Sequence, residues 1–147
     1  MFNRLNLELQ EEAPKVHLLH QKLQDFLQSI LLCFVKPAVI TAASDPLESC
    51  DYKTECNQKA DEDIIVGKSV KQFLSDSKFS AKERDEFYTS VGMYYVAVCN
   101  YVISKFPLHD EVLQHARVAN PMNRMEVAFS SLSFFVKRFH FMEEVLD

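Results

Sequence analysis

The sequence predicts an all-α fold, an irregular bundle of about five to seven helices around a long central helix. Apolar residues recur at steps of three and four along several segments, which is the period of amphipathic helices. The 147 residues include only 2 glycines, which argues against the many tight turns of a β-rich fold and against a glycine-rich phosphate loop. Residues 1–147 are long enough to bury one core, so we expect a single helical domain.

The first part of the chain predicts three helices. A short one covers Phe2 to Gln10, and a long one covers Lys15 to Lys36 with the cleanest apolar stripe in the sequence. Its stripe consists of Val16, Leu19, Leu23, Phe26, Leu27, Ile30, Leu31 and Phe34. Pro37 breaks this helix and suits the first turn of another over Ala38 to Ala43.

Residues 44–63 show no periodicity and hold seven acidic and two basic residues. So long a stretch without secondary structure is unusual in a compact domain, so we expect a mobile or partly disordered acidic loop. The apolar run Ile64 to Val66 follows, and we expect it to pack at the entrance of a helix that ends near Ser75.

The central helix is predicted from Ser80 to Pro107. Ser80 and Glu83 have the spacing of a capping box, and Pro107 cannot continue a helix. Its apolar stripe consists of Phe87, Val91, Tyr94, Val98, Val102 and Phe106, widened by Tyr95, Cys99 and Ile103. A face this broad predicts burial on more than one side. Gly92 either permits close approach of another helix or is a tolerated defect that costs about 1 kcal/mol.

The last third predicts shorter helices. Asp110 is placed to cap a helix over Glu111 to Ala116, a further helical turn is expected at residues 124–128, and Ser130 or Ser131 is placed to cap the last helix. That helix carries more apolar surface than a terminal helix needs. It therefore either lies over the central helix or contacts further protein beyond Asp147.

Charge and cysteine usage limit the functional classes. The net charge of −5 is not the basic footprint of a free-standing nucleic-acid binder. No apolar run reaches about 18 residues and none opens the chain, so neither a membrane span nor a signal peptide is expected. The four cysteines are therefore expected to be reduced thiols in the nucleus or cytoplasm.

No catalytic, cofactor or metal site is predicted. His17 and His20 lie on adjacent helical turns, but a surface pair of histidines is the better interpretation than a zinc edge. Cys50 and Cys56 lack the spacing of a zinc motif. Cys99 is surrounded by apolar residues, which raise the pKa of a thiol, so a core cysteine is favoured over a nucleophile paired with a histidine such as His115.

One cluster of basic residues is a candidate for phosphate contacts. It consists of Lys68, Lys71, Lys78, Lys82 and Arg84. A solvated helix face is the default interpretation of such a cluster, and a nucleic-acid-binding surface is the alternative.

Several motifs in order resemble a known family. They are the segment 31–37 (LLCFVKP) followed by Val39-Ile40, the loop end 61–67, the segment 71–74 (KQFL), Phe87-Tyr88, the segments 105–108 (KFPL) and 110–116 (DEVLQHA), and the segment 129–139. In this spacing they resemble the helical middle region of hAT-type DNA transposases, in particular the transposase-like and zinc-finger BED-like proteins descended from them in animals.

This resemblance implies a place within a large all-α insertion that interrupts an RNase H-like catalytic core. The catalytic carboxylates of the family lie outside the matched region, so no carboxylate of this chain inherits their role. The resemblance further implies a truncated or domesticated product that is not an enzyme. Its expected partners are another protein or the remaining segments of a transposase, with DNA as the weaker alternative.

Overall fold

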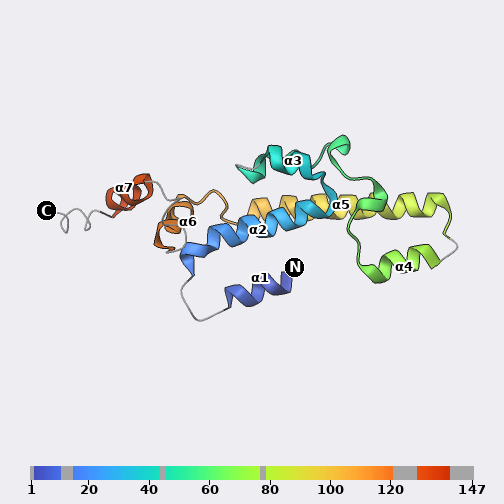
Figure 1. Cartoon of the computed structure of the whole chain (residues 1–147), viewed down its shortest axis with the longest axis horizontal. Helices are drawn as coiled ribbons and strands as arrows, with labels where there is room; N and C mark the ends of the chain where they lie inside the picture. Colours follow the sequence, from blue (N-terminus) through green and yellow to red (C-terminus); the bar gives the residue numbers. More distant parts are fainter. Residues whose placement is uncertain (1, 11–14, 44–45, 77–78, 121–128, 140–147) are drawn as a thin grey trace. The chain divides into compact units, whose positions relative to one another are not determined.

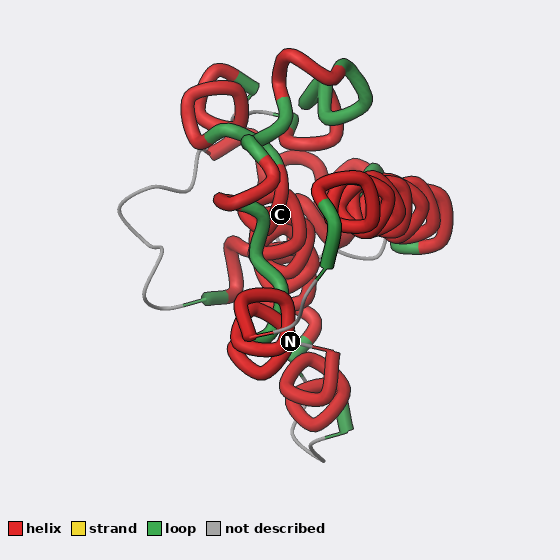
Figure 2. Tube along the Cα trace, turned by 90° about the vertical axis from the view of Figure 1, so that its right-hand side faces the viewer, coloured by secondary structure: helices red, strands yellow, loops and turns green. Residues whose placement is uncertain are grey.

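A computed structural model describes residues 2–10, 15–43, 46–76, 79–120 and 129–139. The described part contains seven α-helices and no strand, with one isolated antiparallel bridge between Val35 and Gln58 (Figures 1 and 2). The all-α prediction is confirmed. The helices are α1 (Phe2–Leu9), α2 (Val16–Phe34), α3 (Pro37–Ala42), α4 (Lys68–Asp76), α5 (Ala81–Lys105), α6 (Glu111–Ala116) and α7 (Phe129–Arg138).

The chain divides into two compact units. One consists of residues 25–106, and the other of residues 1–24 together with 107–147. The boundary falls inside α2 and directly after α5. No helix among the described residues is both long and apolar enough to cross a membrane.

The core of the 25–106 unit forms where the second half of α2 meets α5. Phe34 is fully buried and stacks on Tyr95 with ring centroids 5.4 Å apart, while Phe26 stacks on Phe106 at 5.8 Å. Because the later α2 residue meets the earlier α5 residue, the two helices run antiparallel. Cys99 and Val102 complete the buried face of α5.

The segment 46–66 closes the C-terminal end of α2. The last carbonyl groups of a helix have no partner within it. The backbone N–H of Lys59 donates to Phe34 O at 2.7 Å, that of Ile65 donates to Cys33 O at 2.9 Å, and Lys59 Nζ donates to Leu32 O at 2.7 Å. Because Pro37 starts α3 directly afterwards, α2 cannot continue and its last carbonyl groups lack helical donors. Residues 46–66 supply those donors instead.

The same segment is folded through three short 3-10 helices, Leu47–Ser49, Glu55–Asn57 and Asp61–Asp63. Leu47, Cys50, Tyr52 and Ile64 are buried. Tyr52 also donates to Asn100 Oδ1 of α5 at 2.9 Å. This packing differs from the partly disordered loop that composition indicated for residues 44–63, of which 44 and 45 lie outside the described residues. The mobility of the segment stays a prediction.

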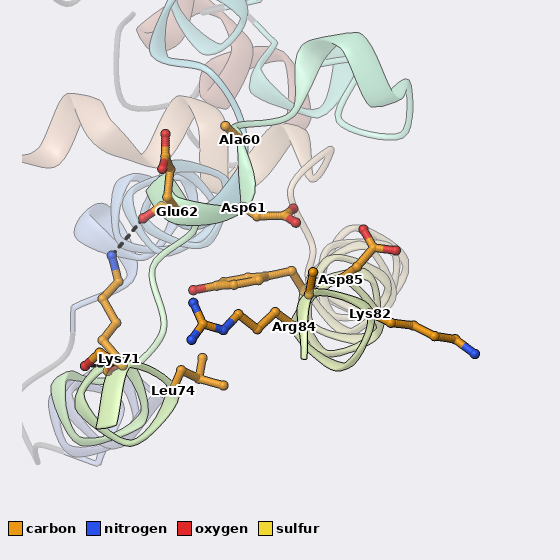
Figure 3. A pocket seen from close by; sticks show the side chains of 11 residues that line it. Ala60, Asp61, Glu62, Lys71, Leu74, Lys82, Arg84 and Asp85 are labelled. Atoms are coloured by element: carbon orange, nitrogen blue, oxygen red, sulfur yellow. Dashed lines mark hydrogen bonds between the residues drawn. The ribbon is translucent and has the colours of Figure 1, made fainter. Parts of the chain in front are cut away.

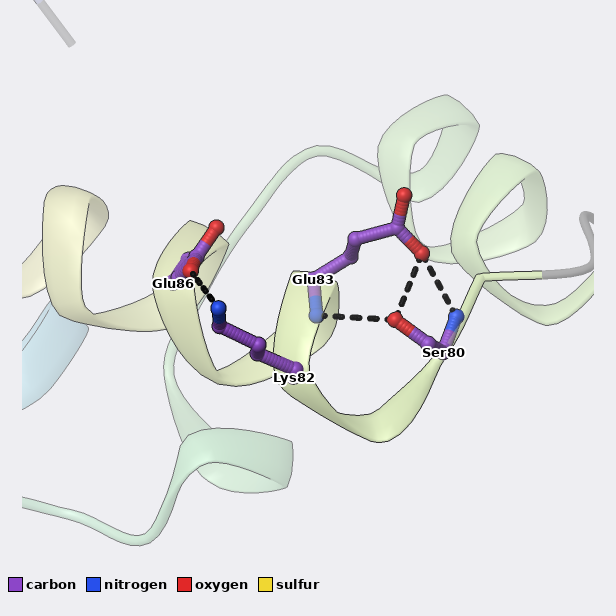
Figure 4. Close-up of polar contacts among 4 residues, drawn as sticks. All are labelled: Ser80, Lys82, Glu83 and Glu86. Atoms are coloured by element: carbon purple, nitrogen blue, oxygen red, sulfur yellow. Dashed lines mark hydrogen bonds and ion pairs between the residues drawn. The ribbon is translucent and has the colours of Figure 1, made fainter.

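Helix α5 begins as the sequence predicts. Ser80 Oγ accepts from the Glu83 N–H at 3.3 Å, and Glu83 Oε2 accepts from the Ser80 N–H at 2.8 Å, which is a complete capping box (Figure 4). These hydrogen bonds to Ser80 hold the pKa of Glu83 below its ordinary value. The helix ends at Lys105, and Phe106 adopts an extended backbone before Pro107.

Burial of α5 on more than one side is wrong. Among its residues, Gly92, Cys99 and Val102 are buried, and all three lie on one face. Tyr94, which the apolar stripe placed inside, is 61% exposed, whereas the neighbouring Tyr95 faces the core. No other described helix packs closely against Gly92. A Cβ built there would meet Gln58 Oε1 at 3.7 Å, which is an ordinary van der Waals contact.

The second unit has few buried apolar side chains in its described part, namely Leu23, Leu108 and Ala116. Polar contacts connect its elements: the Leu108 carbonyl lies 3.1 Å from His20 Nε2 and accepts from Gln114 Nε2 at 3.2 Å. Asp110 caps α6 through Leu113 N–H at 3.0 Å, as predicted.

The prediction for the start of the last helix is wrong. Helix α7 begins at Phe129, so Ser130 and Ser131 lie inside its first turn and neither is its cap. Ser131 Oγ instead lies 3.0 Å from His115 Nδ1 of α6. The helical turn expected at residues 124–128 lies outside the described residues.

Candidate functional site

Three residues of the predicted basic cluster, Lys71, Lys82 and Arg84, line a pocket between α4 and α5, in the 25–106 unit. The pocket has a volume of about 980 Å³ and is lined by Lys71, Leu74, Arg84, Asp85 and Tyr88, with Asp61 and Glu62 along one edge (Figure 3). Helix α4 supplies Lys71 and Leu74, and the first turns of α5 supply Arg84, Asp85 and Tyr88.

The structure brings only part of the cluster together. Lys71 and Arg84 both line the pocket, and Lys71 Nζ donates to the Glu62 carbonyl oxygen at 3.0 Å. Lys82 touches the pocket edge, but its ammonium group extends away from Lys71 and lies 3.7 Å from Glu86 Oε1 (Figures 3 and 4). Lys68 is exposed and does not line the pocket, and Lys78 lies outside the described residues.

The charge of the pocket is mixed. Three basic residues, Lys71, Lys82 and Arg84, share it with three acidic ones, Asp61, Glu62 and Asp85. A phosphate group in the pocket would therefore meet carboxylates as well as cations, which offsets much of the attraction that phosphate binding needs. The cluster looked basic in the sequence because it was defined by its cations alone. The acids that join them in the pocket are Asp61 and Glu62, from an earlier segment, and Asp85, which follows Arg84.

A second pocket of about 520 Å³ continues along α5. It lies between α5 and residues 53–64, and it shares Asp61 and Tyr88 with the first pocket. Met93, Val96 and Ala97 give it an apolar wall, and Lys53 and Lys59 contribute cations. Gly92 forms part of this wall, so the missing side chain there widens the pocket.

The buried thiols have the surroundings of core residues. Cys33, Cys50 and Cys99 are buried, and Cys56 is exposed. Burial raises the pKa of Cys99 to about 12, and burial together with the nearby Asp51 raises that of Cys50. A thiol with a raised pKa is a poor nucleophile, so these two side chains suit packing rather than covalent chemistry.

Two of the histidines weighed as ligands or bases, His20 and His115, have other contacts. His20 contacts the Leu108 carbonyl, and His115 contacts Ser131 Oγ and stacks on Phe134 with ring centroids 4.2 Å apart. Within the described ranges, no group of three or more histidine, cysteine or acidic side chains is arranged to hold a metal ion.

The outer face of α5 is a surface that the sequence reasoning missed. We use this name for Met93, Tyr94, Ala97 and Tyr101, flanked by Ser90 and Ser104. Met93, Tyr94 and Tyr101 are 69%, 61% and 63% exposed, although they lie in the middle of the longest described helix. Helical geometry puts this face opposite the buried Gly92, Cys99 and Val102. Of its residues only Tyr94 belongs to the predicted apolar stripe, so the stripe gave no signal for Met93 and Tyr101.

No family model, curated protein or solved structure matches this chain. The resemblance to hAT-type transposases therefore stays a prediction, carried by the sequence motifs alone. What the arrangement offers chemically is a mixed-charge pocket, its apolar continuation and the outer face of α5.

Proposed function

We propose that this chain is a non-catalytic helical domain that binds another protein, derived from the insertion region of a hAT-type transposase. The observation that carries the binding role is the outer face of α5. Exposed aromatic and methionine side chains in a contiguous group are enriched at protein interfaces. Scattered exposed apolar residues need no explanation, but these three occupy one face within nine residues of a single helix, Met93 to Tyr101.

The anchoring of Tyr94 supports the same role. Its ring contacts that of Tyr95 at a centroid distance of 5.8 Å. Tyr95 is itself fixed, because it stacks on Phe34 and donates to the Ile65 carbonyl at 2.6 Å. A pre-positioned aromatic side chain loses little conformational entropy on binding, which is a property of interface hot spots.

Site-specific photo-crosslinking tests the binding role. A photoreactive phenylalanine analogue replaces Tyr101, and a matched variant carries it at Leu7, which is similarly exposed at 66%. We expect a discrete crosslinked protein adduct from position 101. An excess of the unlabelled chain should abolish this adduct by competition, whereas an excess of the Tyr94→Glu variant should not. Equal adducts from both positions, or none from position 101, would refute the proposal.

The non-catalytic part has its own test. The purified chain is incubated with DNA and Mg²⁺ or Mn²⁺, and strand cleavage is measured. We expect none above background, because the carboxylates that hold the metals in the family lie outside the matched region. The proposed compartment is the nucleus or the cytoplasm.

The genomic sequence flanking the reading frame tests the proposed descent from a transposase. Catalytic-core segments on both sides would identify a transposase fragment.

Nucleic-acid binding is the alternative, and one observation favours it: Lys71, Lys82 and Arg84 line one pocket. The acidic residues of that pocket make it the weaker candidate. A DNA titration at several salt concentrations decides it, since each neutralised phosphate adds to the salt dependence of the affinity. A steep slope that Arg84→Ala and Lys71→Ala both reduce would establish it, and absent binding at low salt would remove it.

A further inference from the structure

By residue type, the midline of the outer face of α5 reads the same in both directions, with its two tyrosines offset by one residue. Its midline residues are Ser90, Tyr94, Ala97, Tyr101 and Ser104, spaced by four, three, four and three. Such alternating steps define the seam by which one helix packs on another. Reversing the helix gives Ser, Tyr, Ala, Tyr, Ser with Ala97 at the centre. In a two-fold symmetric contact both partners present the same patch, so an antiparallel pair would place like residue types of this midline opposite each other.

We infer that the partner of this face is a second copy of the chain, packed antiparallel through α5. This inference rests on the proposed function and names its partner. In this register Ala97 faces its own counterpart, and its small side chain lets the two helices approach closely. Tyr94 faces Tyr101 of the second copy, and the symmetry makes this pair twice. Aromatic pairs of this kind stabilise a contact beyond the area that they bury.

The polar residues of the seam fit the same arrangement. Ser90 Oγ donates to the Glu86 carbonyl at 2.8 Å, and Ser104 Oγ donates to the Tyr101 carbonyl at 2.9 Å. Both hydroxyl groups therefore already have a hydrogen-bond acceptor inside their own helix. Covering them leaves no hydroxyl donor unpaired, which removes a large part of the usual cost of burying serine.

Charge selects the antiparallel orientation. The face begins beside Glu83 and Glu86, of which Glu86 also pairs with Lys82 at 3.7 Å, and it ends beside Lys105. An antiparallel pair places each Lys105 next to the acidic end of the other copy, whereas a parallel pair places acids against acids and lysine against lysine. Exposed ion pairs contribute little affinity, but unfavourable like-charge contacts discriminate between orientations.

The size of the face sets the expected strength. Stable interfaces bury about 800 Å² on each partner, and one seam of five residues with Met93 at its edge offers less. We therefore expect a weak dimer whose population rises with concentration. Sedimentation velocity on the full chain across roughly 1 µM to 1 mM should show a monomer–dimer equilibrium within this range.

Three variants and one control locate the contact. Tyr101→Glu should leave the far-ultraviolet circular dichroism unchanged and weaken the dimer at least tenfold, whereas Leu7→Glu at an equally exposed site should not. Lys105→Glu should weaken it, and adding Glu86→Lys should restore it. A chain that is monomeric throughout, or a dimer indifferent to Tyr101→Glu, would overturn the inference.

Disulfide trapping tests the orientation. The background variant carries Cys56→Ser, because Cys56 is exposed and the other cysteines are buried. Mixing Ser90→Cys with Ser104→Cys chains under mild oxidation should give the mixed dimer, since residues 90 and 104 face each other. Predominant 90–90 and 104–104 products would overturn the antiparallel arrangement.

The photo-crosslinking experiment separates this inference from the proposed function. If crosslinks from position 101 reach only other proteins and the chain stays monomeric, the inference fails while the proposed function stands. If position 101 gives no adduct, both fail.

Discussion

The two units of the chain bury their described side chains to very different extents. Of the 18 buried apolar residues in the described ranges, all but Leu23, Leu108 and Ala116 belong to the 25–106 unit. The other unit leaves Leu7 66% and Phe129 81% exposed and connects its helices largely through polar contacts such as His115 with Ser131. Because burial of apolar area is the main stabilising term, the 25–106 unit should carry most of the folding free energy.

The largest expected effect comes from truncating the centre of that core. Phe34 is fully buried against Tyr95 and Tyr52, so Phe34→Ala should lower the free energy of unfolding by about 3–5 kcal/mol. Phe129→Ala, at a phenylalanine that is 81% exposed, should change it by less than about 0.5 kcal/mol. Urea unfolding followed by circular dichroism measures both. Similar losses from the two variants would contradict the unequal division of stability.

Alkaline pH should destabilise the same unit. Burial raises the pKa of Cys99 from 9.0 to about 12 and that of Tyr95 from 10.0 to about 12. Between pH 9 and 12 the unfolded chain therefore binds fewer protons than the folded chain, so the free energy of unfolding falls as pH rises. Below pH 9 this contribution is fully present. Urea titrations at several pH values measure the slope, and Cys99→Ala should make it shallower. A free energy that is constant or rises over this range would disprove the expectation.

Leu108→Ala probes the sparsely packed unit. Leu108 is fully buried, and the described part of its unit has few other buried apolar side chains. Its truncation should therefore cost near the lower end of the usual 2–5 kcal/mol, roughly 2 kcal/mol. Hydrogen exchange with mass spectrometry should show faster exchange in α6 and residues 16–24. Exchange in α5 should stay unchanged. Faster exchange throughout α5 would indicate that the two units unfold together.

One of the hydrogen bonds that join the 46–66 segment to α5 is made by Tyr52, and its loss should have a smaller effect. Tyr52→Phe removes the donor to Asn100 Oδ1 and should cost about 0.5–1.5 kcal/mol. A double-mutant cycle with Asn100→Ala isolates the pair, and strict additivity would show that the bond contributes nothing. Tyr101→Phe serves as the exposed control.

Helix identity followed from the sequence because periodicity, capping residues and proline act locally. Three helix starts are set by atoms only a few residues away. These are the start of α5 by Ser80 and Glu83, that of α6 by Asp110, and that of α3 by Pro37. The folding of residues 46–66 could not be predicted in this way. Its path depends on α2 carbonyls that accept from Lys59 and Ile65, and such long-range partners leave no periodic pattern in the sequence.

The candidate site was predicted even less well, for a related reason. Lys71 and Arg84 are near in sequence and do line one pocket, but the acids that offset their charge come partly from residues 61 and 62. For α5, periodicity identified the apolar residues without showing which side the core covers. Tyr94 and Tyr95 are adjacent and chemically identical, yet only Tyr95 meets Phe34.

Gly92 gives the smallest predicted effect and decides between two interpretations of the sequence. If it were needed for close packing, a methyl group would destabilise α5. The new Cβ would instead lie 3.7 Å from Gln58 Oε1, an ordinary contact, so the gain in helix propensity should dominate. We expect Gly92→Ala to raise the free energy of unfolding by up to about 1 kcal/mol, because alanine restricts the unfolded chain more than glycine does. Gly67→Ala, placed just before α4 with no atom within 4 Å of its Cβ, should gain less because it lies outside a helix interior. Destabilisation by Gly92→Ala in urea unfolding would show instead that Gln58 cannot yield, and that the glycine is kept for the fit between α5 and the 46–66 segment.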